Sequence, residues 1–448
     1  MVADPGLDGL AQAYVGLALR LDRVLPGVLD AHLGEPARVD DGPAPDAGAL
    51  AREADHLRAE LSGSSGADAG RAAFLAAQLR ACRVLAERAG GREVGFVDEV
   101  ERSFGVRISP GDRDGYREAH RTLGGLLGGS GDLATRLAAF RDGDRLAPGH
   151  LPVALRAAVR ALRERTAATV GLPPGEDVAL EVVDSAPWSG FSRWVGPLRS
   201  AVTVNGGISH RMTHLPLLVA HEAYPGHHTE HCRLAAAPDR LRARPERRVF
   251  LARTPQSLIA EGAAELGLEA VVGPGWGRWN AEVLAGAGVP ADPEQGALGE
   301  AVESVMARLA PVRQDAALML HDRHRPADEV VAHLRRWLLV DEPRARRMLE
   351  FLAHPRWRTH TTTYVEGARL LRPWLLGPDR PGGAAPSRAV VTARLAQVLD
   401  DPPTPAALQA GGRVAPSTTS VRPRPERAGW APWLRRTVVP HRRSPENG

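Results

Sequence analysis

The sequence contains no lysine, so all 57 of its basic residues are arginines. They are set against 53 acidic residues, and the formal net charge of +4 is too small to indicate a nucleic-acid-binding protein. The excess is concentrated at the C-terminal end, where residues 401–448 carry eight arginines and three acidic residues. The rest of the chain is close to electrical balance, and we predict no nucleic-acid partner.

Cysteine is also scarce, because the 448 residues include only Cys82 and Cys232. Two cysteines this far apart do not make the framework of a disulfide-rich secreted protein, which favours a reducing compartment. Charged residues interrupt the apolar positions of the first thirty residues, so the sequence shows neither a signal peptide nor a membrane-spanning helix. We therefore expect a cytoplasmic protein that does not insert into a membrane.

Aromatic residues make up only 4 % of the chain, whereas alanine and leucine dominate its hydrophobic 43 %. This composition favours helices over sheets. Helical periodicity predicts an N-terminal helical subdomain over residues 1–170. Residues 171–400 are predicted to form a second subdomain, in which an aromatic loop separates short strands at 178–183 and 201–205. The Pro- and Arg-rich residues 401–448 are predicted to be a disordered tail.

The most informative segment reads His221-Glu222-Ala223-Tyr224-Pro225-Gly226-His227-His228. Imidazole is a common zinc ligand, and a carboxylate beside the first ligand can take a proton from a zinc-activated water. The usual His-Glu-x-x-His pattern puts both histidines on one helix face, but Pro225 prevents a regular helix from continuing here. A bulged turn would draw His221 and His227 together. We predict that both bind zinc and that Glu222 is the catalytic general base.

The neighbouring His228 competes with His227 for the role of second histidine ligand. In a straight helix, His228 would share the face of His221 but lie about 10 Å along the axis. We take His227 as the ligand and keep His228 as the alternative ligand, with a place in the wall of the site if it does not bind the metal.

The sequence also indicates a third metal ligand further along the chain. Residues 257–269 read as a helix on which Glu261 and Glu265 lie one turn apart. Glu261 would complete a site of two histidines and one glutamate with a position left open for water. Glu265 is expected to hydrogen-bond a ligating imidazole, although it also reads as an ordinary solvated carboxylate.

These residues resemble a known bacterial family, the domain of unknown function 885. The resemblance rests on the eight-residue motif, on Val202-Thr203-Val204-Asn205 before it, and on Glu261-Gly262 and Tyr364-Val365-Glu366-Gly367 after it. It covers roughly residues 180–375. The family is grouped with the gluzincin metallopeptidases, which implies a mainly α fold with a small β-sheet beside the zinc-binding helix.

The resemblance also implies roles for residues outside the metal site. Val204 and Asn205 would lie on the edge strand that pairs with extended substrate. Tyr364 would stabilise the oxyanion of the reaction, and His360, one turn earlier, is the weaker candidate for the same role.

Together these observations predict a zinc-dependent hydrolase, a metallopeptidase that acts on a peptide or small amide. Two alternatives stay open. One is a zinc hydrolase of non-peptide amides or esters. The other is a non-catalytic zinc-binding helical interaction protein, against which the intact His221-Glu222 pair argues, since a structural zinc site needs no general base.

Overall fold

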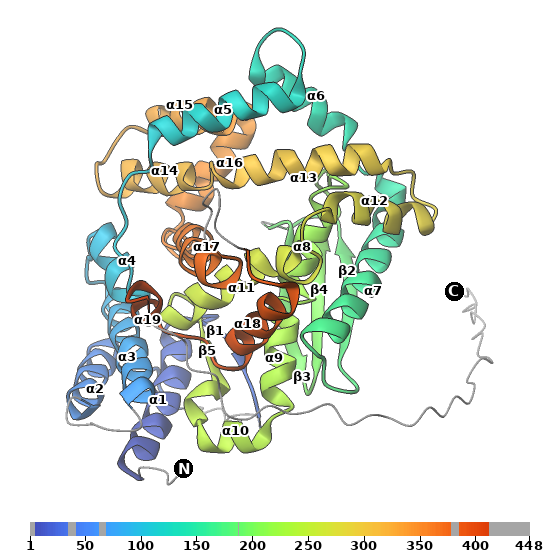
Figure 1. The fold of residues 1–448 in the computed structure, drawn as a ribbon. Coiled ribbons are helices and arrows are strands. Elements are labelled where there is room, and N and C mark those ends of the chain that lie inside the picture. Colours follow the sequence, from blue (N-terminus) through green and yellow to red (C-terminus); the bar gives the residue numbers. More distant parts are fainter. Residues whose placement is uncertain (1–4, 35–41, 62–68, 187, 378–384, 412–448) are drawn as a thin grey trace, which may run out of the picture. The chain divides into compact units, whose positions relative to one another are not determined.

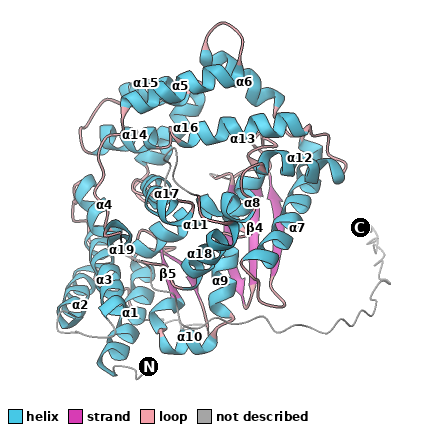
Figure 2. Ribbon diagram, in the orientation of Figure 1, coloured by secondary structure: helices cyan, strands magenta, loops and turns pink. Residues whose placement is uncertain are grey.

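The computed structural model describes residues 5–34, 42–61, 69–186, 188–377 and 385–411. They form a mainly helical fold with two small sheets (Figure 2). A three-stranded sheet lies beside the helix that ends in His221 and Glu222. The predicted fold class, mainly α with a small sheet next to this helix, is confirmed.

Three long N-terminal helices pack around one core, namely α1 (Pro5–Val24), α2 (Ala47–Leu61) and α3 (Ala69–Ala89). After α1, strand β1 (Leu29–His32) pairs in antiparallel fashion with β5 (Val249–Leu251). Val249 and Leu251 are buried in the same core as the three helices. The N-terminal helices are therefore tied directly to the segment that leads into the helix of Glu261.

A second core is shared by helices from two distant parts of the chain (Figure 1). Buried Trp337 packs on Tyr116, whose hydroxyl donates a hydrogen bond of 3.0 Å to Asp315. These elements are α4 (Phe96–Phe104), α5 (Arg113–Leu127), α6 (Leu133–Gly143), α13 (Pro293–Ala307), α14 (Pro311–His321), α15 (Ala327–Leu338) and α16 (Glu342–Ala353).

The third core surrounds α11 (Pro255–Val271), which packs against α8 (Leu215–Glu222), α17 (Thr361–Leu375) and α18 (Arg388–Asp400). Most residues of α11 are buried, as expected for a helix that is apolar on nearly every side. The remaining elements of this part of the chain are η1 (Pro148–His150), α7 (Leu151–Thr169), α9 (His227–Ala235), α10 (Pro238–Ala243), η2 (Pro245–Arg248), α12 (Trp276–Gly286) and α19 (Pro405–Gln409).

The three-stranded sheet has the order β2-β4-β3. Strand β4 (Arg199–Asn205) lies in the centre, parallel to β2 (Asp177–Val183) and antiparallel to β3 (Gly190–Gly196). The two predicted strands are thus present, but the aromatic segment between them is not a loop. It forms β3, because a tight turn at Leu198 (φ 56°) folds it back so that β4 supplies its backbone hydrogen-bond partners.

The predicted subdomain boundary at residue 170 is wrong. The described residues up to 411 form one compact unit, because each large core mixes residues from both sides of that boundary. The predicted tail also begins too early, since Asp401 pairs with Arg247 at 2.5 Å and residues 405–409 form α19 against α17. The rest of the predicted tail, residues 412–448, lies outside the described residues.

The sequence also predicts that the protein does not insert into a membrane. Within the described ranges, every helix is too short or too polar to span a bilayer.

Candidate metal site

The His-Glu motif spans a break between two helices. Helix α8 ends at Glu222, a cis peptide bond precedes Pro225, and α9 begins at His227. The backbone N–H of Gly226 donates a hydrogen bond of 2.8 Å into the last turn of α8. A Cβ on Gly226 would lie 1.9 Å from the carbonyl oxygen of His221, so only glycine fits this turn. The predicted distortion is confirmed, and it brings the rings of His221 and His227 to 4.8 Å between centroids.

His221, His227 and Glu261 form one group of convergent ligand atoms. The two Nε2 atoms lie 3.2 Å apart, and the Glu261 carboxylate lies 3.2 Å from His221 Nε2 and 3.8 Å from His227 Nε2. Ligand bonds of about 2.0–2.1 Å in a tetrahedral zinc site place neighbouring ligand atoms about 3.3 Å apart. The two 3.2 Å separations match this spacing, and two imidazoles with one carboxylate are a donor set that suits zinc.

The hydrogen bonding of Glu261 supports the same interpretation. Its buried Oε2 accepts no hydrogen bond, although His221 Nε2 is only 3.2 Å away. A buried carboxylate oxygen without a hydrogen bond is costly. The lone pairs of this oxygen are therefore free for a cation.

Glu261 owes its position to the start of α11. The side chain of Thr254 accepts a hydrogen bond from the N–H of Ser257, and the hydroxyl of Ser257 accepts one from the N–H of Thr254. This capping box satisfies two backbone donors that a helix start would otherwise leave unpaired. The helix is therefore fixed where it begins, two turns before the ligand.

The charges of the three ligands differ. Burial lowers the pKa of His221. The nearby Glu261 and Glu265 carboxylates outweigh burial and raise this pKa well above its usual value. Burial lowers the pKa of His227 to about 4, so this ring is neutral at pH 7, which is the form that binds metals. Burial opposes ionisation of Glu261, but the two histidines outweigh it and lower its pKa to about 2.

Glu222 lies under the edge of the three-stranded sheet, and its side chain is 9 % exposed. A Cβ on Gly190 of β3 would lie 3.5 Å from Glu222 Cγ and 2.7 Å from Leu218, so the strand approaches α8 closely here. Burial raises the pKa of Glu222 to about 7. The charge of His221 and a backbone hydrogen bond from Ser192 lower this pKa, but burial has the larger effect. A carboxylate with such a pKa can both accept and release a proton near neutrality.

Tyr364 and His360 occupy the start of α17, close to the metal group. The ring of Tyr364 lies 5.9 Å from that of His221, and its hydroxyl is 2.9 Å from His360 Nε2. Burial raises the pKa of Tyr364 well above its usual value, so the hydroxyl stays protonated and can donate. Burial also lowers the pKa of His360. The structure thus places both predicted donors beside the site.

His228 points away from the metal group, into a fully buried hydrogen-bond network. Its Nε2 lies 2.9 Å from Glu176, and its Nδ1 lies 2.9 Å from the hydroxyl of Ser200. Glu176 also accepts hydrogen bonds from Tyr224 and Arg163. Both ring nitrogens of His228 are engaged, so the structure assigns the second histidine of the metal group to His227.

Ser200, His228 and Glu176 have the connectivity of a nucleophilic triad, but burial excludes that role. Ser200 is completely buried, so no substrate can reach its hydroxyl. The network instead fixes the start of α9 against β4. Sequence analysis missed Glu176 and Ser200, because isolated residues ahead of a strand and within it carry no local spacing signal.

Glu265 lies one turn after Glu261 on α11, as predicted. Its carboxylate is 3.4 Å from His221 Nδ1, and its side chain is 44 % exposed. A hydrogen bond at the far nitrogen of a ligating imidazole fixes the ring orientation and the tautomer. This position matches the supporting role predicted for Glu265.

Val204 and Asn205 do not lie where the resemblance implies. They belong to the central strand β4, whose two edges are already paired, and both side chains are buried. The amide of Asn205 donates to the carbonyl of Ala186 instead. Their assignment as substrate-binding residues is therefore wrong, since pairing with an extended substrate requires a free edge. In this sheet β3 is an edge strand on the side of Glu222.

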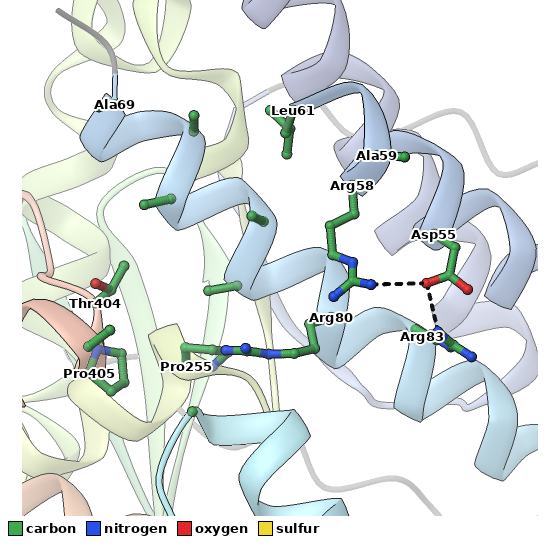
Figure 3. A pocket seen from close by; sticks show the side chains of 16 residues that line it. Asp55, Arg58, Ala59, Leu61, Ala69, Arg80, Arg83, Pro255, Thr404 and Pro405 are labelled. Carbon is green, nitrogen blue, oxygen red and sulfur yellow. Dashed lines mark hydrogen bonds and ion pairs between the residues drawn. The ribbon is translucent and has the colours of Figure 1, made fainter. Parts of the chain in front are cut away.

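A surface cavity of about 900 Å³ lies away from the metal group (Figure 3). Its floor consists of alanines on α3, and Arg58 and Arg83 at its rim both pair with Asp55. No residue of the metal group lines it. This cavity is therefore separate from the metal group.

Comparison with known proteins assigns no family. No family model matches the sequence, and no curated protein matches it. A solved protein from Colwellia psychrerythraea, proposed to be a lipoprotein, shares 16 % identity at a TM-score of 0.43 over 79 % of this chain and 66 % of its own. A second solved protein, from Shewanella oneidensis, is of unknown function and is also proposed to be a lipoprotein. It shares 13 % sequence identity at a TM-score of 0.45, and the match covers 81 % of this chain and 71 % of that protein.

This chain thus spans slightly less than two thirds of the first protein's length. At such TM-scores neither likeness bears on function. The resemblance to the domain of unknown function 885 family stays a prediction.

Proposed function

We propose that this protein is a zinc-dependent hydrolase, and specifically a metallopeptidase. The observation that carries the proposal is the convergence of ligand atoms from His221, His227 and Glu261, with Glu222 directly after the first of them. Structural zinc sites use four protein ligands, whereas catalytic sites use three and leave one position open. The three side chains are 12–19 % exposed, so solvent reaches the group.

His221, His227 and Glu261 would hold the zinc ion. When bound, zinc supplies Lewis acidity, which makes water more acidic and a carbonyl more electrophilic. Glu265 would orient the ring of His221 from its Nδ1 side. Neutral His227 supplies a lone pair without losing a proton first.

Glu222 would move the proton of the reaction. Its carboxylate accepts a proton from the attacking water and then delivers it to the nitrogen of the leaving amine. The buried position under β3 supports this role, because burial brings its pKa close to neutrality. The same residue then serves as base in one step and as acid in the next.

Tyr364 and His360 would stabilise the negative charge that develops on the attacked carbonyl oxygen. Both side chains lie at the start of α17, where the ring of Tyr364 is 5.9 Å from that of His221. A protonated Tyr364 hydroxyl donates a hydrogen bond, and its contact with His360 Nε2 limits its motion. Preorganised donors of this kind are worth about 10²- to 10³-fold in rate.

A peptide substrate is favoured by the edge strand next to Glu222. We infer that an extended substrate pairs with the backbone of β3, in place of the buried β4 residues. The lack of a side chain on Gly190 lets this strand approach α8 where Glu222 emerges. Main-chain pairing of this kind recognises peptides and offers little to simple esters.

Two measurements test the proposed function. Elemental analysis of untagged protein purified with added zinc should give one zinc ion per chain. The same protein should cleave members of a peptide library, with ester and non-peptide amide substrates tested alongside. Removal of zinc with a chelator should abolish cleavage, and adding zinc back should restore it. One zinc per chain with no hydrolysis of any of these substrates would instead support the non-catalytic zinc-binding protein.

A further inference from the structure

A row of aromatic rings leads away from the metal group. The ring of Tyr364 lies 5.9 Å from that of His221, and the ring of His360 lies 5.0 Å from that of Tyr364. Trp357 follows at 5.7 Å from His360, and Phe351 lies 6.3 Å from Trp357. Aromatic rings interact at centroid separations of about 4.5–7 Å, so every ring contacts the next. The aromatic row is therefore continuous from a proposed metal ligand to Phe351.

The outer end of the row is a stacked pair, Phe351 of α16 and Trp357, whose ring planes are parallel to within 7°. Neither residue belongs to the hydrophobic cores that the described residues form, although Leu352, next to Phe351, is buried in one of them. Phe351 is 36 % exposed. Core packing therefore does not explain the pair, and exposed apolar side chains that gather at one place are typical of binding surfaces.

The turn that carries Trp357 is held on both sides by the neighbouring arginines. Arg356 donates a hydrogen bond of 2.8 Å to the carbonyl of Gly27, and its guanidinium lies 4.9 Å from the centre of the Trp357 ring. Arg358 donates a hydrogen bond of 2.8 Å to the buried Glu99 of α4. The ring of Trp357 is thus held in place before any ligand arrives, which lowers the entropic cost of binding.

Solvent reaches every ring of the row. His221 is 14 % exposed at the metal group. Tyr364, His360 and Trp357 are each partly exposed, and Phe351 at the outer end is the most exposed of the five. Since each of these side chains contacts the next, a substrate bound at the metal group can reach the stacked pair along the row.

We propose that the stacked pair binds an aromatic side chain of the substrate. This inference rests on the proposed function and defines its substrate class as peptides with Phe, Tyr or Trp close to the cleaved bond. Aromatic rings favour offset-stacked and edge-to-face contacts with one another, and Phe351 and Trp357 offer both types of contact. The row begins at Tyr364, the proposed donor to the attacked carbonyl, so the bound ring belongs to a residue near that carbonyl.

The charges around the row favour a neutral side chain. Glu261 and Glu265 make the metal site acidic, which disfavours an acidic side chain near the cleaved bond. A basic side chain at the pair would meet the guanidinium of Arg356 over the Trp357 ring. A neutral ring meets neither repulsion and removes the exposed surface of Phe351 from water.

The kinetic test varies one residue of a peptide at each position around the cleaved bond, from alanine to cyclohexylalanine to phenylalanine. At one position, the phenylalanine peptide should exceed the alanine peptide by about tenfold to a hundredfold in kcat/KM, because the ring is buried on binding. It should exceed the cyclohexylalanine peptide, whose side chain has no π system, by about two- to tenfold. Equal efficiency of the phenylalanine and alanine peptides at every position would overturn the proposal.

Substitutions then locate the preference for phenylalanine. Trp357→Ala and Phe351→Ala should each reduce it by about fivefold or more, while cleavage of the alanine peptide stays within about twofold of wild type. Trp357→Phe keeps a ring at that position and should restore most of the preference. Equal losses for the phenylalanine and alanine peptides in these variants would overturn the proposal.

Trp374→Ala is the matched control. Trp374 is also a partly exposed tryptophan with a guanidinium over its ring, that of Arg394 at 5.7 Å. It lies on α17 ten residues after Tyr364, about 15 Å further along the axis and beyond the row. Its loss should leave the preference unchanged. An effect equal to that of Trp357→Ala would contradict a binding site at the stacked pair.

A binding measurement separates this proposal from the proposed function. Calorimetry with Glu222→Gln protein and added zinc should show tighter binding of the phenylalanine peptide than of the alanine peptide. Adding Phe351→Ala should remove the difference without lowering the melting temperature, because this exposed ring is part of no core. Selective binding without hydrolysis by wild type would refute the peptidase and keep the aromatic site. Hydrolysis of both peptides with equal efficiency would refute the aromatic site alone.

Discussion

Gly262 of α11 and Gly367 of α17 touch through their backbones. A Cβ on Gly262 would lie 2.3 Å from the carbonyl carbon of Gly367, and a Cβ on Gly367 would lie 2.3 Å from the carbonyl oxygen of Leu258. Each glycine lies close in sequence to a residue of the site, Gly262 directly after Glu261 and Gly367 three positions after Tyr364. The close crossing of the two helices therefore sets the separation between Glu261 and Tyr364.

Gly262→Ala should destabilise the protein and disturb the site. The added methyl group meets backbone that cannot rotate away, which costs about 1–3 kcal/mol of unfolding free energy. Denaturant unfolding measures this loss, and zinc affinity should fall with it because Glu261 moves. Gly16→Ala is the control, since nothing lies within 4 Å of that Cβ and alanine favours the α1 helix by about 0.5–1 kcal/mol. Equal stability of both variants would contradict the close crossing.

His227→Ala and His228→Ala should fail in different ways. Loss of His227 removes a ligand atom from a partly exposed group, so zinc content should drop while the metal-free protein keeps its melting temperature. Loss of His228 leaves Glu176 and Ser200 without their partner in a fully buried network, which should cost about 1–3 kcal/mol or more. Zinc analysis and unfolding of chelator-treated protein distinguish the two. Loss of zinc from His228→Ala at unchanged stability would move the ligand assignment.

Much of the metal site was predictable because its signals are local. His221, Glu222 and His227 lie within one turn-like segment, and Glu261 and Glu265 lie on one helix whose face follows from their spacing. Glu176 had no such signal, since long-range packing alone brings its side chain to His228. Strand β3 was missed for the same reason: its backbone partner β4 follows only after a turn.

The arrangement of the helices into cores was also not predictable from local signals. Apolar periodicity predicts helices over residues 7–24, 49–61, 71–89 and 151–169. Helices α1, α2, α3 and α7 begin and end within two residues of these ranges. Which helices share a core does not follow from periodicity, because a helix face specifies burial and leaves its partner open. The wrong boundary at residue 170 came from treating neighbours in sequence as neighbours in space.

Glu261→Gln and Glu265→Gln should weaken zinc binding to different extents, because Glu261 is the proposed ligand and Glu265 only orients His221. At position 261 the substitution would place a neutral amide where two histidines and a cation need a carboxylate, so zinc should be lost almost completely. Glu265 only contacts the far nitrogen of His221, and its replacement should weaken zinc binding by about 10- to 100-fold. Competition with a chromophoric chelator measures both constants. Equal losses in the two variants would remove the distinction between these roles.

His231 should make the protein less stable in acid. Its ring packs on Trp194 and Phe250, with centroids 5.7 and 4.5 Å away, and burial lowers its pKa to about 3. Below about pH 6.5 the unfolded chain gains a proton that the folded chain does not, so stability falls by about 1.4 kcal/mol per pH unit. This contribution is fully present above pH 6.5 and is lost as the pH falls towards 3.

The variant His231→Phe isolates that contribution, since it keeps an aromatic ring and removes the titration. Between pH 7.5 and pH 5, chelator-treated wild type should lose about 2 kcal/mol more unfolding free energy than the variant. Identical pH dependence of the two proteins would show that His231 takes up its proton in the folded state.

Glu222→Gln should separate metal binding from chemistry. The amide keeps the shape of the side chain under β3 but cannot accept a proton, so the zinc content should match wild type while kcat falls by about 10² to 10⁴. The loss should appear in kcat with little change in KM, because the proton moves only in the transition state. Peptide cleavage by both proteins, each checked for one zinc per chain, is the measurement. Equal activity would take Glu222 out of the mechanism and leave Tyr364 and His360 as the remaining groups able to handle the proton.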